Sequence, residues 1–257
     1  MARKLLRLES VSRKFGGLDA LRNVTYAVPE GVIQAIIGPN GAGKTTLFNC
    51  VSGVFPPTSG SIYLDGVRID GLPSHKIAAL GVSRTFQNVA LFKNMSVLEN
   101  VMLGRHRQSR AGFLACGFRL PSMRREEQEI IRRAREYLDF VGLVDEENKP
   151  AGSLPLGKQK ILEIARALAT EPRLLLLDEP AGGLNTAETE QLGDLIRRIK
   201  KTLGVTVLLV EHDMNLVMEC SDLVVVLHFG TVLASGTPSE VKNNEKVIEV
   251  YLGSAAN

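Results

Sequence analysis

Short apolar runs of strand length recur along this 257-residue chain and give the first indication of its fold. Runs with the composition of buried strands lie at residues 32–37, 174–177, 205–210 and 223–229. A helix is predicted at residues 186–203, between the second and third runs, because Asn185 followed by Glu188 is a capping pattern. This alternation of strand, helix and strand predicts a parallel sheet.

The N-terminal and middle segments have a different character. Residues 5–28 alternate polar and apolar positions, with turn signals at Gly16-Gly17 and at residues 29–31, which predicts short antiparallel strands. Residues 60–67 predict a further strand. From about residue 88 to 169 the pattern becomes helical, with arginine and glutamate between apolar positions such as Ile130, Ile131, Ala134, Leu138 and Val141.

The predicted fold class is therefore α/β, with a mainly parallel sheet, an N-terminal antiparallel β subdomain and an inserted α-helical subdomain. We expect a single domain over residues 1–257, with a core at 1–87 and 170–257 and a helical subdomain at 88–169. The chain is long enough to bury a substantial core, and its 44% hydrophobic and 23% charged residues are ordinary for a globular protein.

Charge and hydropathy exclude some classes of function. The net charge of +3 is too small to indicate a nucleic-acid partner, and we expect none. The basic stretch at residues 105–110, with Arg119, Arg124 and Arg125, has few aromatics around it and is expected to be a solvated face. A face near anionic lipid headgroups is the alternative, if this part of the chain docks beneath a membrane partner. No signal peptide and no transmembrane segment are predicted, because the apolar runs are too short. Any action at a membrane is therefore expected to go through partners.

The first candidate for chemistry follows the apolar run at residues 32–37. The segment Gly38-Pro39-Asn40-Gly41-Ala42-Gly43-Lys44-Thr45-Thr46 fits the phosphate-binding pattern G-x-x-x-x-G-K-[ST], and Leu47 and Phe48 continue into a predicted helix. Its glycines let the backbone curl around a polyphosphate, with N–H groups pointing at the anion. Lys44 is expected to reach the β- and γ-phosphates, and the Thr45 hydroxyl to hold Mg²⁺.

The second candidate is a pair of acids, Asp178 and Glu179, directly after the run at residues 174–177. In a phosphoryl-transfer site one carboxylate holds Mg²⁺ and the other polarises the attacking water. We assign Asp178 to the metal and Glu179 to the general base. A strand that simply ends in solvated acids is the alternative.

Together with other segments, these motifs resemble the ATP-binding subunit of an ABC transporter over essentially the whole chain. The phosphate loop and residues 174–179 match the two Walker motifs of that family. Further matches are the glutamine loop at 84–87, the signature motif at 154–159 with its helix at 164–168, the dimer-contact loop at 181–185 and the switch histidine at 211–213.

The resemblance implies roles for individual residues. Residues 38–46 would bind ATP, and Phe15 would stack on its adenine, since stacking needs only a flat π face; a core aromatic on a hairpin is the alternative for Phe15. Gln87 would link Mg²⁺ and the attacking water to the helical subdomain, unless it is an ordinary exposed glutamine. His212 would donate a hydrogen bond to the γ-phosphate.

The signature motif departs from the family pattern Leu-Ser-Gly-Gly-Gln. Leu154 and Gly157 remain, whereas Pro155, Leu156 and Lys158 replace the other residues. Pro155 has neither a hydroxyl nor a backbone N–H, so it cannot donate to a partner's ATP. Leu154, Gly157 and Lys158 are therefore the signature residues expected to act on that ATP, Lys158 by adding a positive charge. In the dimer-contact loop Asn185 replaces the usual acid, and we hypothesise pairing with a different ATPase subunit and two unequal sites.

Within the family the chain resembles the larger ATPase subunit of branched-chain amino-acid importers. This resemblance is carried by residues 84–87, 95–100, 183–185 and 211–214, by the signature variant, by the insertion at 104–125 and by the ending at 243–253. It implies ATP and Mg²⁺ as cofactors and two integral-membrane permeases as partners. It also implies a periplasmic or extracellular solute-binding protein and a peripheral place on the cytoplasmic face of the inner membrane.

Other functions stay open at this point. Importers for urea or short amides have similar ATPase chains. A soluble ABC-type ATPase acting on nucleic acid or ribosomes usually carries a coiled-coil insertion, a zinc module or a second cassette, none of which is recognisable. A GTP-binding switch needs Asn-Lys-x-Asp, and the nearest segment, at residues 148–151, lacks the acid.

Overall fold

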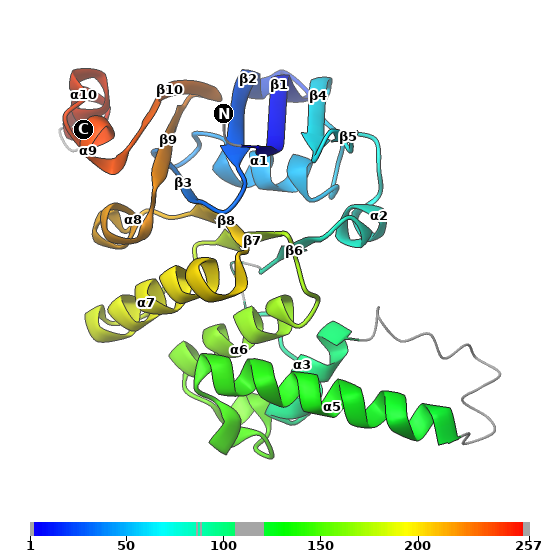
Figure 1. The fold of residues 1–257 in the computed structure, drawn as a ribbon. Coiled ribbons are helices and arrows are strands. Elements are labelled where there is room, and N and C mark those ends of the chain that lie inside the picture. Colours follow the sequence, from blue (N-terminus) through cyan, green and yellow to red (C-terminus); the bar gives the residue numbers. More distant parts are fainter. Residues whose placement is uncertain (1–2, 86, 88, 106–120, 254–257) are drawn as a thin grey trace. The chain divides into compact units, whose positions relative to one another are not determined.

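The structure, a computed structural model, describes residues 3–85, 87, 89–105 and 121–253, which form two compact units (Figure 1). The first unit comprises Met1–Arg84 and Arg173–Asn257, and the second comprises Thr85–Pro172. The boundaries expected from the sequence, after residues 87 and 169, each differ from these by three residues.

The larger sheet of the first unit joins strands that are far apart in the sequence. Its strands are β3 (Ile33–Ile37), β6 (Val82–Arg84), β7 (Leu174–Asp178), β8 (Thr206–Val210), β9 (Leu223–His228) and β10 (Thr231–Gly236). In the described residues their order is β10-β9-β3-β8-β7-β6. All neighbours pair in parallel except β9 and β10, which are antiparallel. The predicted mainly parallel sheet is confirmed.

The second sheet of this unit is antiparallel, with strands β1 (Lys4–Phe15), β2 (Leu18–Pro29), β4 (Ser59–Leu64) and β5 (Val67–Arg68). The prediction of short strands is wrong for β1 and β2, which each run for 12 residues. The pairing of β1 with β2 shifts register at several points, and Ser10 and Asn23 have positive φ angles. Such irregularities interrupt the alternation of polar and apolar residues without ending the strands.

Helices of the first unit follow the strands. They are α1 (Lys44–Val51), α2 (Ser74–Ala79), α7 (Thr186–Leu203), α8 (Met214–Cys220), α9 (Pro238–Lys242) and α10 (Glu245–Gly253). Helix α7 has the predicted bounds, and its start is the predicted capping box: the Asn185 side chain accepts from the Glu188 N–H, and the Glu188 side chain accepts from the Asn185 N–H, both at 3.0 Å. The helix ends at Gly204, whose φ of 65° suits glycine.

Apolar side chains bury both faces of the larger sheet. Ile36 belongs to a core cluster with Leu47 and Phe48 of α1. Its neighbours Ala35 and Ile37 belong to another cluster, with apolar residues of α8, α9 and α10. Because successive side chains of a strand point to opposite faces, β3 has helices on both sides. This double burial is why the parallel strands read as continuous apolar runs.

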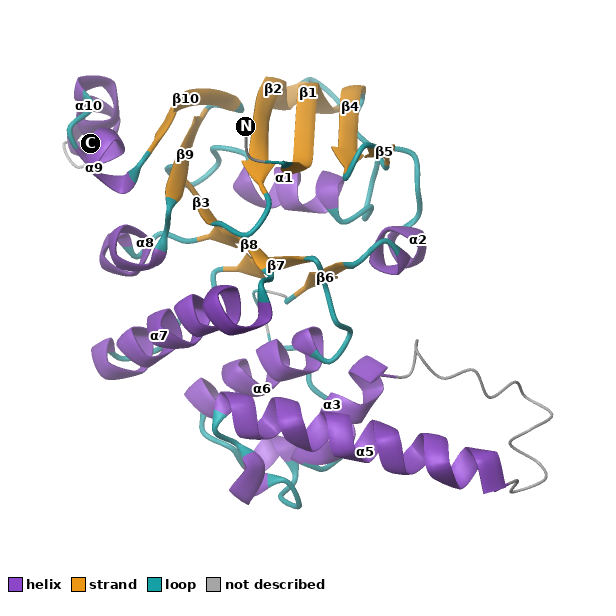
Figure 2. Ribbon diagram, in the orientation of Figure 1, coloured by secondary structure: helices purple, strands orange, loops and turns teal. Residues whose placement is uncertain are grey.

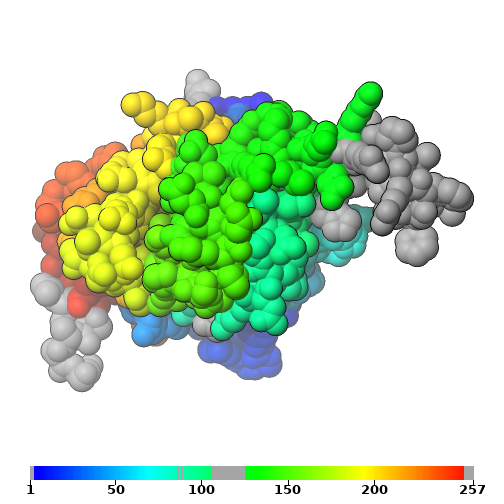
Figure 3. Space-filling view, turned by 90° about the horizontal axis from the view of Figure 1, so that it is seen from below, coloured from blue at the N-terminus to red at the C-terminus, as the bar shows by residue number. Residues whose placement is uncertain are grey.

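The second unit consists of helices and loops in its described residues (Figure 2). Its helices are α3 (Val97–Arg105), α5 (Pro121–Val141) and α6 (Leu156–Leu168), with short 3₁₀ turns η2 (Val144–Glu146) and η3 (Ala151–Ser153). The three helices pack against one another and form a continuous green surface in the space-filling view (Figure 3). The predicted amphipathic helix is α5, with Ala134, Leu138 and Val141 buried.

Two further expectations from the sequence concern the basic stretch around residue 105 and membrane-spanning helices. The basic residues at 106–110 and Arg119 lie outside the described residues. The expected solvated face is wrong for Arg105, which is buried and pairs with Glu171, because α3 packs its C-terminal end into this unit. None of the helices in the described ranges combines the length and apolar character needed to cross a membrane.

Candidate nucleotide-binding site

The phosphate-loop segment lies between β3 and α1, and close packing requires glycine at two of its positions, 38 and 43. A Cβ atom on Gly38 would lie 2.2 Å from the carbonyl oxygen of Leu227, and one on Gly43 would lie 2.5 Å from that of Ala20. Gly43 is also the N-cap of α1, with a φ of 100° and no side-chain cap. The first N–H groups of α1 are therefore available to an anion.

Lys44 is held by the loop from which it projects. Its buried ammonium donates hydrogen bonds to the carbonyl oxygens of Gly38, at 2.7 Å, and Pro39, at 3.1 Å. Burial lowers the pKa of Lys44, and the negative charges of Glu179 and Asp178 oppose this shift. The positive charge thus lies inside the loop, close to both candidate acids.

A cavity of about 360 Å³ opens in front of the loop, entirely within the first unit. Its volume is in the range of small-molecule sites. The predicted residues that line it are Phe15, Asn40, Gly41, Ala42, Gly43, Lys44, Thr45, Thr46 and Glu179. Further lining residues, which the sequence reasoning did not single out, are Leu18, Asp19, Ala20, Arg22 and Phe229. The cavity therefore joins an aromatic side chain, a phosphate-binding loop and a carboxylate.

Phe15 is on the surface of this cavity rather than in the core. Its side chain is 42% exposed, and its ring contacts that of Phe55 edge-on at a centroid distance of 5.3 Å. The guanidinium of Arg13 lies 4.6 Å from the centroid of each ring. These contacts hold the Phe15 ring while leaving part of it open to the cavity.

Asp178 has a partner that the sequence reasoning missed. Its carboxylate accepts a hydrogen bond from Arg84 at 2.7 Å, and both side chains are nearly inaccessible to solvent. Arg84 also donates to the side chains of Asn49 and Ser52, at 2.7 and 2.9 Å. Arg84 ends β6, the edge strand next to β7 in the described sheet, and only the strand order brings it to Asp178.

Glu179 and His212 lie close together, as expected for residues that follow neighbouring strands. His212 Nδ1 is 4.0 Å from the Glu179 carboxylate, and the histidine side chain is 64% exposed. Glu179 has a φ of 48°, which is uncommon for a residue with a side chain, and its N–H donates to Val210 at 2.9 Å. Backbone strain of this kind concentrates at functional sites.

Glu211 is a fully buried acid beside this pair. One carboxylate oxygen accepts from the Ala181 N–H at 2.7 Å, and the other accepts from the N–H groups of His212 and Asp213 at 3.0 and 3.3 Å. Burial raises the pKa of Glu211, against these hydrogen bonds. Sequence reasoning noted Glu211 only as a neighbour of His212, although an acid directly after a buried apolar strand is itself a signal.

The C-terminal helix also reaches the phosphate loop. Tyr251 of α10 packs against the cluster that contains Ala35 and Ile37 and is hydrogen-bonded to the backbone of Gly38. Burial raises the pKa of the Tyr251 hydroxyl, and this hydrogen bond acts in the opposite direction. Helix α10 therefore contacts the phosphate loop, although Tyr251 is more than 200 residues from Gly38 in the sequence.

The remaining predicted residues belong to the second unit. Gln87 is exposed. Leu154 and Gly157 are buried at the start of α6, where Pro155 is an N-cap without a side-chain cap. Lys158 pairs with Glu146, whose pKa is lowered to about 2 by the ammonium groups of Lys149 and Lys158. The positive charge that we expected at Lys158 is thus compensated in this structure.

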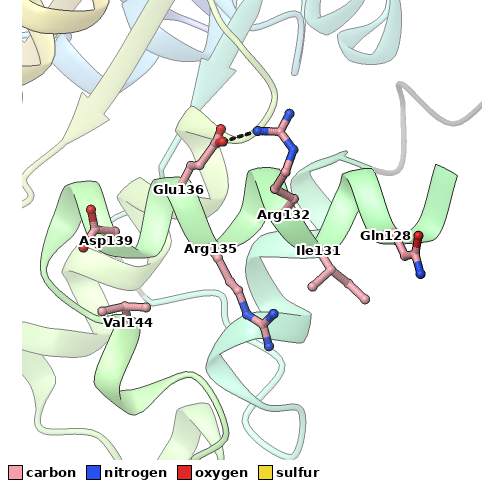
Figure 4. Close-up of a pocket in the computed structure, with 7 residues that line it drawn as sticks. All are labelled: Gln128, Ile131, Arg132, Arg135, Glu136, Asp139 and Val144. Carbon is pink, nitrogen blue, oxygen red and sulfur yellow. Dashed lines mark hydrogen bonds and ion pairs between the residues drawn. The ribbon is translucent and has the colours of Figure 1, made fainter. Parts of the chain in front are cut away.

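A second hollow lies on α5, also within the second unit (Figure 4). It is lined by Gln128, Ile131, Arg132, Arg135, Glu136, Asp139 and Val144. Arg132 pairs with Glu129 and Glu136, and Arg135 pairs with Glu147. These guanidinium groups are matched by nearby carboxylates, so the described part of the hollow does not concentrate positive charge for a phosphate.

The sequence of this chain is similar to that of known protein families. A family described as "ABC transporter" matches residues 21–182, and one described as "Branched-chain amino acid ATP-binding cassette transporter" matches residues 231–257. The chain is 49% identical over 255 residues to the high-affinity branched-chain amino acid transport ATP-binding protein BraF of Pseudomonas aeruginosa, covering 99% of this chain and 100% of that one. It is 45% identical, with the same coverage, to the corresponding protein LivG of Escherichia coli K12.

Solved structures are similar as well. A nucleotide-free ATP-binding cassette from an ABC transporter matches with a TM-score of 0.82 and 30% identity, over 96% of this chain and 98% of that one. A cassette crystallised in an ADP conformation matches with a TM-score of 0.84 and 29% identity, over 97% and 99%.

The position of Lys44 generates a prediction. Lys44→Ala should weaken binding of MgATP by more than about tenfold, because charge-assisted hydrogen bonds to phosphate are lost. Isothermal titration calorimetry measures the affinity, with Lys201→Ala, an exposed lysine in the last turn of α7, as the matched control. Equal affinities for both variants would remove Lys44 from the phosphate site.

Proposed function

This chain belongs to the ABC transporter family as an ATP-hydrolysing subunit, and we propose that it powers the import of branched-chain amino acids. The observation that carries the proposal is the cavity in which the phosphate loop, Phe15 and Glu179 meet. The solute class rests on relatives that are named for branched-chain amino acid transport and match nearly the full chain. No observation favours a urea or amide importer, or a soluble ATPase acting on nucleic acid.

ATP binds, in this proposal, with its adenine on Phe15 and its phosphates on the loop at residues 38–46. The N–H groups at the start of α1 and the Lys44 ammonium neutralise the phosphate charge. When phosphate arrives, Lys44 exchanges the carbonyl oxygens of Gly38 and Pro39 for phosphate oxygens. The buried position of Lys44 strengthens this interaction, because the surroundings screen charge less than water does.

Mg²⁺ fits the oxygen donors that the structure places near the phosphate loop. This ion is usually held by one or two carboxylates together with substrate phosphates, so a dense cluster of acids is not required. The Thr45 hydroxyl and Asp178 are the residues that hold it, and Gln87 is the proposed contact from the second unit. Bound Mg²⁺ neutralises charge that develops on the phosphates. Arg84 holds the Asp178 carboxylate in place for this role.

Hydrolysis needs a base beside the γ-phosphate, and Glu179 is the proposed residue. It follows β7 at the same sheet edge as the loop, and it lines the cavity. His212 lies within 4.0 Å of Glu179 and is exposed, so its ring is free to turn toward a γ-phosphate. Its hydrogen bond would exist with ATP bound and disappear after phosphate release, which makes His212 a sensor of the nucleotide state.

An ATP-binding subunit of this family acts together with membrane permeases. We propose two permease chains, a solute-binding protein and a second, different ATPase subunit, with this chain on the cytoplasmic face of the inner membrane. The altered signature supports the heterodimer, because Pro155 cannot donate a hydrogen bond to the ATP of a partner subunit. This chain's own Lys44 and Glu179 then form the competent site, completed by the partner's signature.

The base assignment predicts a separation of binding from turnover. In the transporter complex, Glu179→Gln should keep the ATP affinity but lower the hydrolysis rate by about 100-fold or more, since general-base catalysis is lost while the phosphate cradle stays. Phosphate release and ATP titration measure the two quantities, with the exposed Glu190→Gln as control. Cells that carry only Glu179→Gln should lose uptake of labelled leucine and keep uptake of labelled urea. A wild-type hydrolysis rate in Glu179→Gln would exclude Glu179 as the base.

The heterodimer has its own test. Affinity purification of the chain from its own cells in mild detergent should recover two polytopic permeases and a second, different ATPase, identified by mass spectrometry. Recovery of ribosomal proteins or nucleic acid without membrane proteins would contradict the transporter. An isolated chain that forms an ATP-dependent homodimer and hydrolyses at the full rate of the complex would contradict the heterodimer.

A further inference from the structure

The turn between β9 and β10 carries an aromatic side chain in an unfavourable setting. Phe229 is 72% exposed, and its backbone has a φ of 44°. A bulky residue is a genuine outlier in this left-handed region, where glycine, asparagine or aspartate is usual. An exposed phenyl ring gains nothing from burial. Neither the exposed ring nor the left-handed backbone stabilises the protein by itself. A contact between the ring and a ligand would account for both.

The turn is fixed in place by the elements of the nucleotide site. The Gly230 N–H donates to the carbonyl oxygen of Ala42 at 3.1 Å, and the Arg22 N–H donates to that of Gly230 at 2.7 Å. A Cβ atom on Gly230 would lie 2.8 Å from the carbonyl oxygen of Ala20. Gly230, the residue after Phe229, therefore fixes this turn to both the phosphate loop and the β1–β2 hairpin.

The ring lines the same cavity as the residues already described. Phe229, Phe15 and the 65% exposed Leu18 are its large apolar side chains, whereas residues 40–46 supply its phosphate-binding part. His228 contacts the Phe229 ring at a centroid distance of 4.3 Å and limits its rotation. A ligand with a flat apolar group attached to a triphosphate matches this division of the cavity.

We propose that Phe229 is a second base-contacting residue, which covers the purine ring of ATP together with Phe15. This proposal rests on the proposed ATP site. Binding buries the exposed ring of Phe229 against the base, and aromatic contact with a base adds affinity without requiring a specific hydrogen bond. The strained turn then serves to hold the ring at the mouth of the cavity.

Phe229→Asn tests this directly, because asparagine accepts the left-handed backbone but removes the ring. Two probes separate base from phosphate: MgATP and magnesium tripolyphosphate, which has no base. We expect Phe229→Asn to weaken MgATP binding by about tenfold and to leave tripolyphosphate binding unchanged. Phe229→Tyr should retain MgATP affinity, and Phe92→Asn, which removes an exposed ring in the second unit, should have no effect.

Each other outcome overturns the proposal. Unchanged MgATP affinity in Phe229→Asn shows that the base does not touch the ring. Equal losses for both probes show that Phe229 supports the phosphate loop rather than the base. A wild-type chain that binds tripolyphosphate but gains nothing from the base excludes both aromatic contacts, and one that binds neither probe overturns the proposed function itself.

A separate observation concerns Glu211. This buried carboxylate accepts from Ala181, two residues after Glu179, and from His212 and Asp213 in the loop after β8. The two loops that carry the proposed base and the proposed sensor are thus bound to one side chain. The His212 ring also faces it, with Nδ1 at 3.8 Å. We infer that Glu211 is a positioning residue that ties the dimer-contact loop to His212.

Glu211→Gln keeps the size of the side chain but replaces one acceptor oxygen by an NH₂ group. In the transporter complex we expect the hydrolysis rate to fall by about tenfold to 100-fold while ATP affinity is unchanged, since misplacing a catalytic group by about 1 Å can cost about 100-fold. Asp222→Asn is the matched control. The Asp222 carboxylate accepts a hydrogen bond of 2.7 Å from the Ile33 N–H, and Asp222 does not line the cavity. This variant should therefore lower stability and leave the hydrolysis rate unchanged.

A double-mutant cycle separates positioning from general support of the fold. In a His212→Ala background, Glu211→Gln should have little further effect on turnover if it acts through His212. If Glu211→Gln lowered the hydrolysis rate by the same factor with and without His212, the inference would be overturned. A lower melting temperature with an unchanged hydrolysis rate in Glu211→Gln would show a purely structural role.

Discussion

The contact between Gly38 and Leu227 is the constraint on which the site depends. A side chain at Gly38 would collide with the Leu227 carbonyl oxygen, so the phosphate loop can lie against the end of β9 only with glycine there. Parallel pairing of β3 with β8 and β9, and of β7 with β8, then brings the carboxyl ends of these strands to the same edge. The loop, the acids Asp178 and Glu179 at the end of β7, and His212 after β8 meet for this reason, as expected for ligand sites of parallel sheets.

Buried charge at this edge is compensated before any nucleotide arrives. Loop carbonyl oxygens hold the Lys44 ammonium, Arg84 holds Asp178, and backbone N–H groups hold Glu211. An unpaired charge in such surroundings is costly, so each partner also fixes a position. In the proposed site, nucleotide binding is therefore an exchange of partners at Lys44 rather than the creation of a new buried charge.

Sequence patterns predicted what depends on neighbours along the chain. The phosphate loop, the two acids at the end of β7 and the capping box at Asn185 are each encoded within a few residues, and the parallel sheet follows from the alternation of elements. The pair of Arg84 and Asp178 was not predictable in this way, because it depends on β6 lying beside β7. The same holds for Phe229, whose place at the cavity requires the packing of its turn on Ala42. The lengths of β1 and β2 were underestimated because bulges interrupt their alternation.

The signature region shows how pairing within one unit bears on proposed assembly. The ammonium groups of Lys149 and Lys158 lower the pKa of Glu146 to about 2, so Glu146 keeps its charge, and its pair with Lys158, well into the acidic range. The Lys158 side chain is nevertheless 45% exposed, and exposed ion pairs contribute little to stability. In the proposed heterodimer, the triphosphate of the partner's ATP would carry more negative charge than Glu146 and would draw Lys158 away at small cost. Under this proposal Pro155 takes away the hydrogen-bond donor of the usual serine, while Lys158 would supply its charge once the partner's ATP is in place.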